Sequence, residues 1–303
     1  MNLVIDYTTG LVVLGNLAFA CTAGMLSPFV TLRRESFLGD GTAHAALAGI
    51  FFILIFPSLA TTLTLLIGGL SAALLAHFIL FFLQQETKLN KDMILAITLS
   101  LFIALALVLF TALIGHLEKL ATLTTLTSAT ERSSTLIRHY IFGSPASLTQ
   151  TEALLLITVA LSATIMMLCF YKVWKLFTFD ATWAQTLGFS FTTSEFLFKA
   201  LFITTVMTGL FSVGALMVSA LFVAPSIAAR VFTTRLKPLI ALSITINFTT
   251  TSLALFLGSK FTGIPEGPTI VFLTSLLAII LPLIAYSYHR YRHLLGPRFK
   301  KYH

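Results

Sequence analysis

The chain has 303 residues, of which 57% are hydrophobic and 10% are charged, and its mean hydropathy is +0.96. Soluble domains usually carry about a quarter charged residues, so this composition excludes a soluble protein and predicts an integral membrane protein. The formal net charge is +8, and the two cysteines, Cys21 and Cys169, lie far apart in apolar runs, which excludes a disulfide framework. We expect one polytopic domain over residues 1–303.

The positions of the charged residues divide the chain into apolar spans. Residues 11–30 predict span one. The uncharged stretch from Asp40 to Glu86 is too long for one helix of about 17 to 25 residues, so we expect a hairpin that breaks at Phe56-Pro57-Ser58. Further spans are expected at 93–115, 153–171, 195–211, 213–229, 239–258 and 268–288, with a polar segment over 116–150. The prediction is an all-α transmembrane bundle of about nine helices, within limits of about eight to ten.

The basic residues predict the orientation of this bundle. Most of the 19 Lys and Arg residues fall in alternate loops and in the C-terminal tail. These are Arg33, Arg34, Lys88, Lys91, Lys172, Lys175, Arg230, Arg235, Lys237, Arg290, Arg292, Arg298, Lys300 and Lys301. The positive-inside rule then places the N-terminus outside and the C-terminus in the cytoplasm. The positive charge is explained by topology and by membrane lipid, and it requires no nucleic acid partner.

Asp40 and His44 are the most informative polar residues of the apolar part. Their spacing of four places an acid and an imidazole one helical turn apart, on one face of span two. Ionisable residues inside a membrane usually serve function, and these two side chains suit Mn(II), Fe(II) and Zn(II) alike. The sequence predicts a metal-binding pair, while a helix N-cap for Asp40 and a packed histidine for His44 remain open. Because Arg33 and Arg34 precede the pair closely, we expect it nearer the inner side.

Motifs for catalysis are missing from the sequence. It contains no phosphate-binding loop, no Gly-x-Ser-x-Gly elbow and no His-Glu-x-x-His pair. We therefore expect no enzyme activity and no permanently bound cofactor, and transport is the leading class of function.

One expected inner loop, Phe179–Phe189, has the pattern of a short helix. Asp180 is a candidate N-cap and Gly188 a candidate C-cap. Ala184 and Gly188 are small and four residues apart, so a partner surface could approach closely. The pattern fits either a docking helix for a cytoplasmic partner or a helix that lies on the lipid surface.

Several groups of residues, taken together and in this order, form a specific pattern over the whole chain. They are Leu32-Arg33-Arg34, Gly39-Asp40, His44-Ala45, Asp180, Ala184, Leu187-Gly188, the run 214–221, Pro225, Ala228-Ala229-Arg230 and Pro265-Glu266-Gly267-Pro268-Thr269-Ile270. With these residues the chain resembles, from end to end, the membrane permeases of the bacterial ABC importers for manganese, zinc and iron, the ABC-3 family. Glu266 departs from the small polar residue that many relatives have there.

The resemblance implies a function and its residues. It implies that Asp40 and His44 belong to the pathway of a transported divalent ion, and that Asp180, Ala184 and Gly188 belong to a coupling helix near 180–189. It also implies a permease in the bacterial plasma membrane that works with a second copy or a homologous permease. The other expected partners are a cytoplasmic ATPase dimer, where ATP is hydrolysed, and an extracytoplasmic metal-binding protein.

Two alternatives remain beside this interpretation. One is an ion- or proton-coupled secondary transporter for metal, and the other is an ABC permease for metal chelates such as cobalamin or siderophores. The sequence does not distinguish manganese, zinc and iron, because the same ligand types bind all three.

Overall fold

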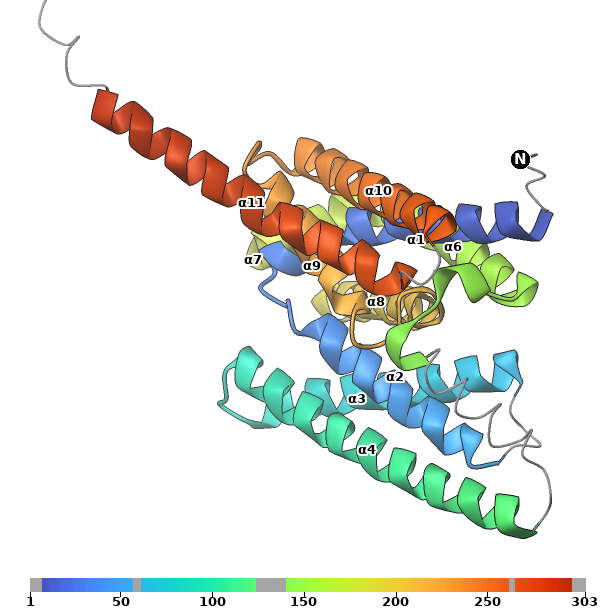
Figure 1. Cartoon of the computed structure of the whole chain (residues 1–303). Coiled ribbons are helices and arrows are strands. Elements are labelled where there is room, and N and C mark those ends of the chain that lie inside the picture. Colours follow the sequence, from blue (N-terminus) through green and yellow to red (C-terminus); the bar gives the residue numbers. More distant parts are fainter. Residues whose placement is uncertain (1–6, 57–60, 124–139, 262–264, 296–303) are drawn as a thin grey trace, which may run out of the picture.

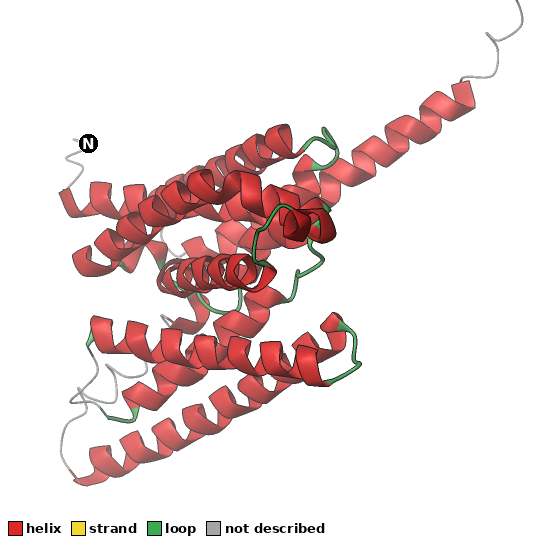
Figure 2. Ribbon diagram, turned by 180° about the vertical axis from the view of Figure 1, so that it is seen from behind, coloured by secondary structure: helices red, strands yellow, loops and turns green. Residues whose placement is uncertain are grey.

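The computed structural model describes residues 7–56, 61–123, 140–261 and 265–295, and within these ranges the chain forms helices and no strands (Figures 1 and 2). The long helices are α1 (Tyr7–Leu32), α3 (Thr62–Glu86), α4 (Lys91–Leu123), α6 (Gln150–Phe179), α8 (Phe191–Ser212), α10 (Leu236–Lys260) and α11 (Glu266–Leu295). The short ones are α2 (Leu38–Leu54), α7 (Ala181–Thr186), α9 (Val218–Ala229) and the 3₁₀ turn η2 (Pro145–Ser147).

Seven of the described helices are long and apolar enough to cross a membrane, and α2 and α9 are shorter apolar helices. The predicted all-α polytopic bundle is therefore confirmed.

Several helices differ in length from the predicted spans. α2 ends before the predicted break and α3 begins after it. Pro57 and Ser58 of this break lie outside the described residues. α6 continues beyond the predicted end at Tyr171. Its exposed Lys172 and Lys175 do not interrupt the helix, which ends only where Asp180 leaves the helical conformation. The predicted span 213–229 begins late, since Gly214 has a φ of +89° and the chain turns before α9 starts.

The helices form two groups that meet at α8 and α9 (Figure 1). In one group, α2 packs against α3 and α4. In the other, α1 packs against α6, α9 and α10, and α11 covers α9 and α10. α8 contacts α1, α6, α2 and α3, and 72% of its most apolar stretch is buried, compared with 11% for α11. α8 is therefore the central helix of the described bundle.

Close packing and buried amides hold these groups together. A Cβ atom on Gly49 of α2 would lie 2.1 Å from the backbone oxygen of Gly68 on α3, so only glycine permits this approach. Asn247 of α10 donates to the carbonyl oxygens of Ala20 and Leu221, at 3.3 and 3.1 Å. Such small residues and interhelical hydrogen bonds are the usual means by which helices associate in lipid.

Candidate functional site

The turn between α1 and α2 determines where Asp40 and His44, the predicted metal-binding pair, lie. Arg34 has a φ of +58°, and the amides of Arg34 and Glu35 donate to the carbonyl oxygens of Thr31 and Val30, at 3.2 and 3.0 Å. These two hydrogen bonds form a Schellman motif, which ends α1. Phe37 is then the N-cap residue of α2 and caps it without a side-chain hydrogen bond.

Asp40 lies in the first turn of α2, three residues after the N-cap. The structure therefore excludes the N-cap role that the sequence left open for it. A carboxylate in the first turn still gains from the helix dipole. His44 follows one turn later on the same helix. The predicted spacing on one helix face is confirmed.

Asp40, Gly41 and His44 form an open patch on a helix that is otherwise mostly buried. Asp40 and His44 are partly exposed, whereas the residues from Ala45 to Phe51 are buried. No atom of the neighbouring helices lies within 4 Å of the Cβ position of Gly41. In the described part of the chain, neither the Asp40 side chain nor the His44 side chain forms a hydrogen bond or an ion pair. Both side chains are therefore available to a cation.

The open patch lies near the middle of the bundle. A Cβ atom on Gly39 would lie 3.0 Å from the Ser219 side chain and 3.8 Å from the Phe202 ring. Phe202 is the midpoint of α8, which is about 33 Å long at about 1.5 Å per residue. α2 therefore begins beside the middle of α8, and the position of the pair relative to the inner side of the membrane stays a prediction.

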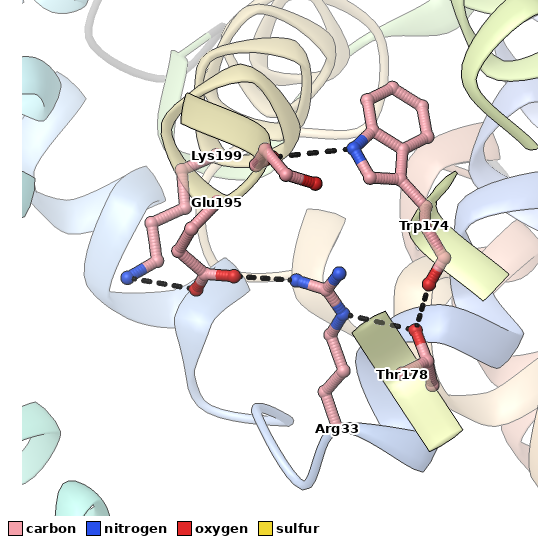
Figure 3. A network of polar contacts seen from close by, with 6 residues as sticks. Arg33, Trp174, Thr178, Glu195 and Lys199 are labelled. Carbon is pink, nitrogen blue, oxygen red and sulfur yellow. Dashed lines mark hydrogen bonds and ion pairs between the residues drawn. The ribbon is translucent and has the colours of Figure 1, made fainter. Parts of the chain in front are cut away.

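A buried ion network ties the end of α1 to α6 and α8 (Figure 3). The Arg33 guanidinium lies 2.9 Å from the Glu195 carboxylate and donates to the Thr178 hydroxyl at 3.2 Å. It also stacks over the Phe198 ring at 4.2 Å. The Lys199 ammonium lies 3.3 Å from the other Glu195 oxygen. This network fixes the turn from which α2 starts.

Sequence patterns do not indicate this network. Arg33 fits the distribution of basic residues that predicts the topology, and Glu195 marks only the start of a predicted span. The acid and base spacing of Glu195 and Lys199 at the entry of an apolar helix is the signal that could have indicated it.

α7 is capped as the sequence predicts. The Asp180 carboxylate accepts from the Trp183 amide at 2.9 Å and from the Thr182 hydroxyl at 2.7 Å. These hydrogen bonds lower the pKa of Asp180, because they stabilise its charged form. Gly188 has a φ of +84°, and the Phe189 amide donates to the Ala184 carbonyl oxygen at 3.3 Å, which closes the helix.

The exposed surface of α7 differs from the predicted one in one residue. Ala184 is fully buried, on the side of α7 that packs against α6 and α8, so its small side chain does not face a partner. Trp183 and Leu187, exposed by 57% and 54%, form the outward surface instead. The neighbouring Phe179 and Phe189 are exposed as well.

A polytopic helical bundle with ionisable side chains in an otherwise apolar helix is typical of a membrane transport protein. Comparison with known proteins specifies the class. A sequence profile of the ABC 3 transport family matches residues 6–285, and the chain therefore belongs to this family. It is the membrane permease of an ATP-binding cassette transport system, a multi-pass protein of the bacterial plasma membrane rather than an enzyme.

Individual relatives cover nearly the whole chain. The chain is 29% identical over 280 residues to the zinc transport system membrane protein TroC of Treponema pallidum, covering 92% of this chain and 90% of that protein. It is 28% identical over 276 residues to the manganese transport system membrane protein MntC of Bacillus subtilis, covering 90% of this chain and 60% of that protein.

Among solved structures, PsaBC from Streptococcus pneumoniae in complex with Fab has a similar fold. The TM-score is 0.75 at 24% identity, and the match covers 96% of each chain. Within the residues that the structure describes, no group of three or more His, Cys, Asp or Glu side chains could hold a metal ion. The pair of Asp40 and His44 is therefore at most part of a ligand set in one chain.

Proposed function

We propose that this permease belongs to an importer that moves a divalent transition metal ion, Mn²⁺, Zn²⁺ or Fe²⁺, into the cell. The observation that carries the proposal is the open patch, where Asp40 and His44 lie together at mid-depth without protein partners. The names of the relatives agree, since they are zinc and manganese transport proteins. The chain acts as a single permease domain and retains no permanent cofactor.

The rest of the ligand set comes from a second permease, either another copy or a homologous chain. Asp40 and His44 are partly exposed on α2, whereas most of this helix is buried against its neighbours. If two chains face each other through the open patch, two carboxylates and two imidazoles meet around one ion. Such a set suits all three metals, and a site divided between two chains can loosen to release the ion.

Coupling to ATP is assigned to α7. Its exposed Trp183 and Leu187 present an apolar surface to a cytoplasmic ATPase dimer, while Asp180 and Gly188 fix its two ends. Buried Ala184 lets α7 lie close to α6 and α8. This assignment places the loop at 180–189 in the cytoplasm, the N-terminus outside, and α2 and α9 as the two short members of nine spans.

Alternating access follows from these contacts. α7 packs against α8, and α8 packs against α2, so a movement of α7 on ATP binding reaches the metal-binding pair through packed helices. The two permeases rock against each other and the ion, delivered by an extracytoplasmic metal-binding protein, passes Asp40 and His44. A secondary transporter would need no docking surface of this kind, and a chelate permease would need no acid and imidazole pair.

Metal uptake in proteoliposomes that contain the ATPase tests the pair. Asp40→Asn and His44→Ala should each lower ⁵⁴Mn²⁺ or ⁶⁵Zn²⁺ uptake by tenfold or more, on the order of the effect of losing a metal ligand. Glu86→Gln, which changes an exposed acid at the end of α3, is the matched control. Uptake by both site variants at the level of this control would exclude the pair as the metal site.

Pull-down of the ATPase tests α7 separately. Gly188→Arg replaces a residue with a positive φ that has no neighbour within 4 Å of its Cβ position, and it projects a long cation beside Leu187. We expect loss of ATPase capture while the permease remains folded. Normal capture and normal ATP turnover would show that α7 is not the docking element.

A further inference from the structure

A cleft of about 590 Å³ opens between the end of α6 and the start of α10. Tyr171, Lys175 and Phe179 line it from α6, and Arg235, Lys237 and Pro238 line it from the beginning of α10. The three α6 residues are four apart, so they share one face of the helix. This volume matches that of a small-molecule site.

The cleft is cationic and its charges are not compensated. Lys175, Arg235 and Lys237 are exposed, and no acid lines the cleft. Within the described residues, none of these three side chains forms a hydrogen bond or an ion pair. Arg235 is also the N-cap residue of α10, and no side chain caps this helix. The cleft therefore attracts an anion and has nothing of its own to neutralise the three cations.

A polar group in the cleft lacks a partner as well. The Tyr171 hydroxyl is buried and has no hydrogen-bond partner among the described residues. Its ring packs edge to face on Phe29 near the end of α1, at 6.4 Å between centroids. A tyrosine with an apolar ring contact and an unsatisfied hydroxyl is typical of the boundary between lipid and water.

The depth of the cleft agrees with this boundary. α6 has 30 residues and is about 45 Å long, which exceeds the roughly 30 Å of a hydrocarbon core. Its last turns, which carry Lys175 and Phe179, therefore reach the headgroup region.

An apolar strip of α1 lies between α6 and α10. α1 contacts both α6 and α10, and these two helices have hardly any contact with each other. On this strip α1 carries Leu17, Cys21 and Met25, which are four residues apart and each partly exposed. Exposed Leu168 lies one turn before Tyr171 on α6. An acyl chain can pack on this apolar surface while its headgroup lies in the cleft.

We infer that the cleft binds the phosphate headgroup of an anionic phospholipid. Lys175, Arg235 and Lys237 surround the phosphate, and the acyl chains follow α1. The site lies at the end of the bundle that carries α7, at the foot of α6, so bound lipid joins α6 to α10 there.

The test uses the full-length permease in neutral detergent, titrated with phosphatidylglycerol and followed by its melting temperature. The cleft variant is Lys175→Gln/Arg235→Gln/Lys237→Gln. The control Lys88→Gln/Lys172→Gln/Arg230→Gln removes the same charge from exposed positions outside the cleft. Each cation near an anionic lipid is worth about a fivefold change in affinity, so the cleft variant should bind on the order of a hundredfold more weakly. The control should bind like the wild type.

Two further measurements distinguish the sources of the anion. Phosphatidylcholine, which has the phosphate without the net charge, should stabilise the wild type much less than phosphatidylglycerol. Inorganic phosphate at the same concentration should have no effect, because it lacks the acyl chains. Equal binding by the cleft variant and the control, or full stabilisation by inorganic phosphate, would overturn the inference.

Discussion

Removing the Glu195 carboxylate should destabilise the whole bundle. The side chains of Arg33 and Glu195 are exposed by only 8% and 14%, so the pair is shielded from water. Glu195→Ala would leave the guanidinium of Arg33 and the ammonium of Lys199 next to each other without a counter-charge. Breaking a buried pair on one side costs about 3 to 5 kcal/mol, and we take about 3 kcal/mol because some exposure remains.

This free energy corresponds to a measurable change in melting temperature. For a large domain about 1 kcal/mol shifts the midpoint by about 2 °C, so Glu195→Ala should lower it by about 6 °C. The assay is thermal unfolding of the purified permease in detergent, with Glu86→Ala as the control for loss of an exposed acid. The same midpoint for both variants would refute the reasoning, because the pair would then be screened like a surface pair.

A triple variant separates charge from packing. Arg33→Met/Glu195→Leu/Lys199→Met removes all three charges and keeps most of the volume, and apolar replacement of a buried ion network is often neutral. It should melt well above Glu195→Ala. A midpoint as low as that of the single variant would mean that Glu195 acts through shape rather than through charge.

Three further predictions concern α2 and α7. Gly49→Ala should destabilise the permease by about 1 to 3 kcal/mol, because the added Cβ would meet the Gly68 backbone. Gly41→Ala on the same helix should be neutral or slightly stabilising in thermal unfolding, because its Cβ position is free. Equal effects of the two variants would refute the packing of α2 on α3. The pKa of Asp180 is lowered from its usual value of 3.8, so its contribution to α7 should be complete above that pH and lost only as the pH falls through the lower folded value. Trp183 fluorescence in a Trp174→Phe background should therefore stay constant down to pH 5 and change only in stronger acid, and the change should be missing in Asp180→Asn. Gly188→Ala should loosen the end of α7 by about 1 to 2 kcal/mol, since alanine disfavours a φ of +84°, and faster amide exchange at Phe189 would report it; unchanged exchange would refute the cap.

Local features of the sequence predicted most of the fold. Charged residues and proline interrupt apolar runs, so the break between α2 and α3 was visible, and so were both caps of α7. The spacing of Asp40 and His44 directly predicted their shared face. The end of α6 and the start of α9 were harder to predict from the sequence. α6 continues past its exposed lysines, and the positive φ of Gly214 delays the start of α9.

Long-range contacts account for what the sequence did not predict. Arg33 contacts Thr178 and Glu195, which lie 145 and 162 residues further along the chain, and no local pattern indicates such a pairing. The position of Asp40 in the bundle depends on the packing of Gly39 against Ser219. Its distance from Arg33 along the sequence does not predict this position. Burial of Ala184 likewise follows from α7 packing on α6 and α8 rather than from its spacing to Gly188.

The stoichiometry of bound metal is the sharpest consequence of a divided site. In the described residues of one chain Asp40 and His44 have no third His, Cys, Asp or Glu ligand nearby. If a second copy supplies the remaining ligands, saturating Mn²⁺ should bind as one ion for two permease chains, and a mixed pair of wild-type and His44→Ala chains should bind more weakly than the wild type. Metal analysis after equilibrium dialysis, combined with light scattering for the oligomeric state, measures both quantities. One tightly held ion for each chain would mean that a single permease completes its own site, and the facing arrangement of the two copies would then have to be abandoned.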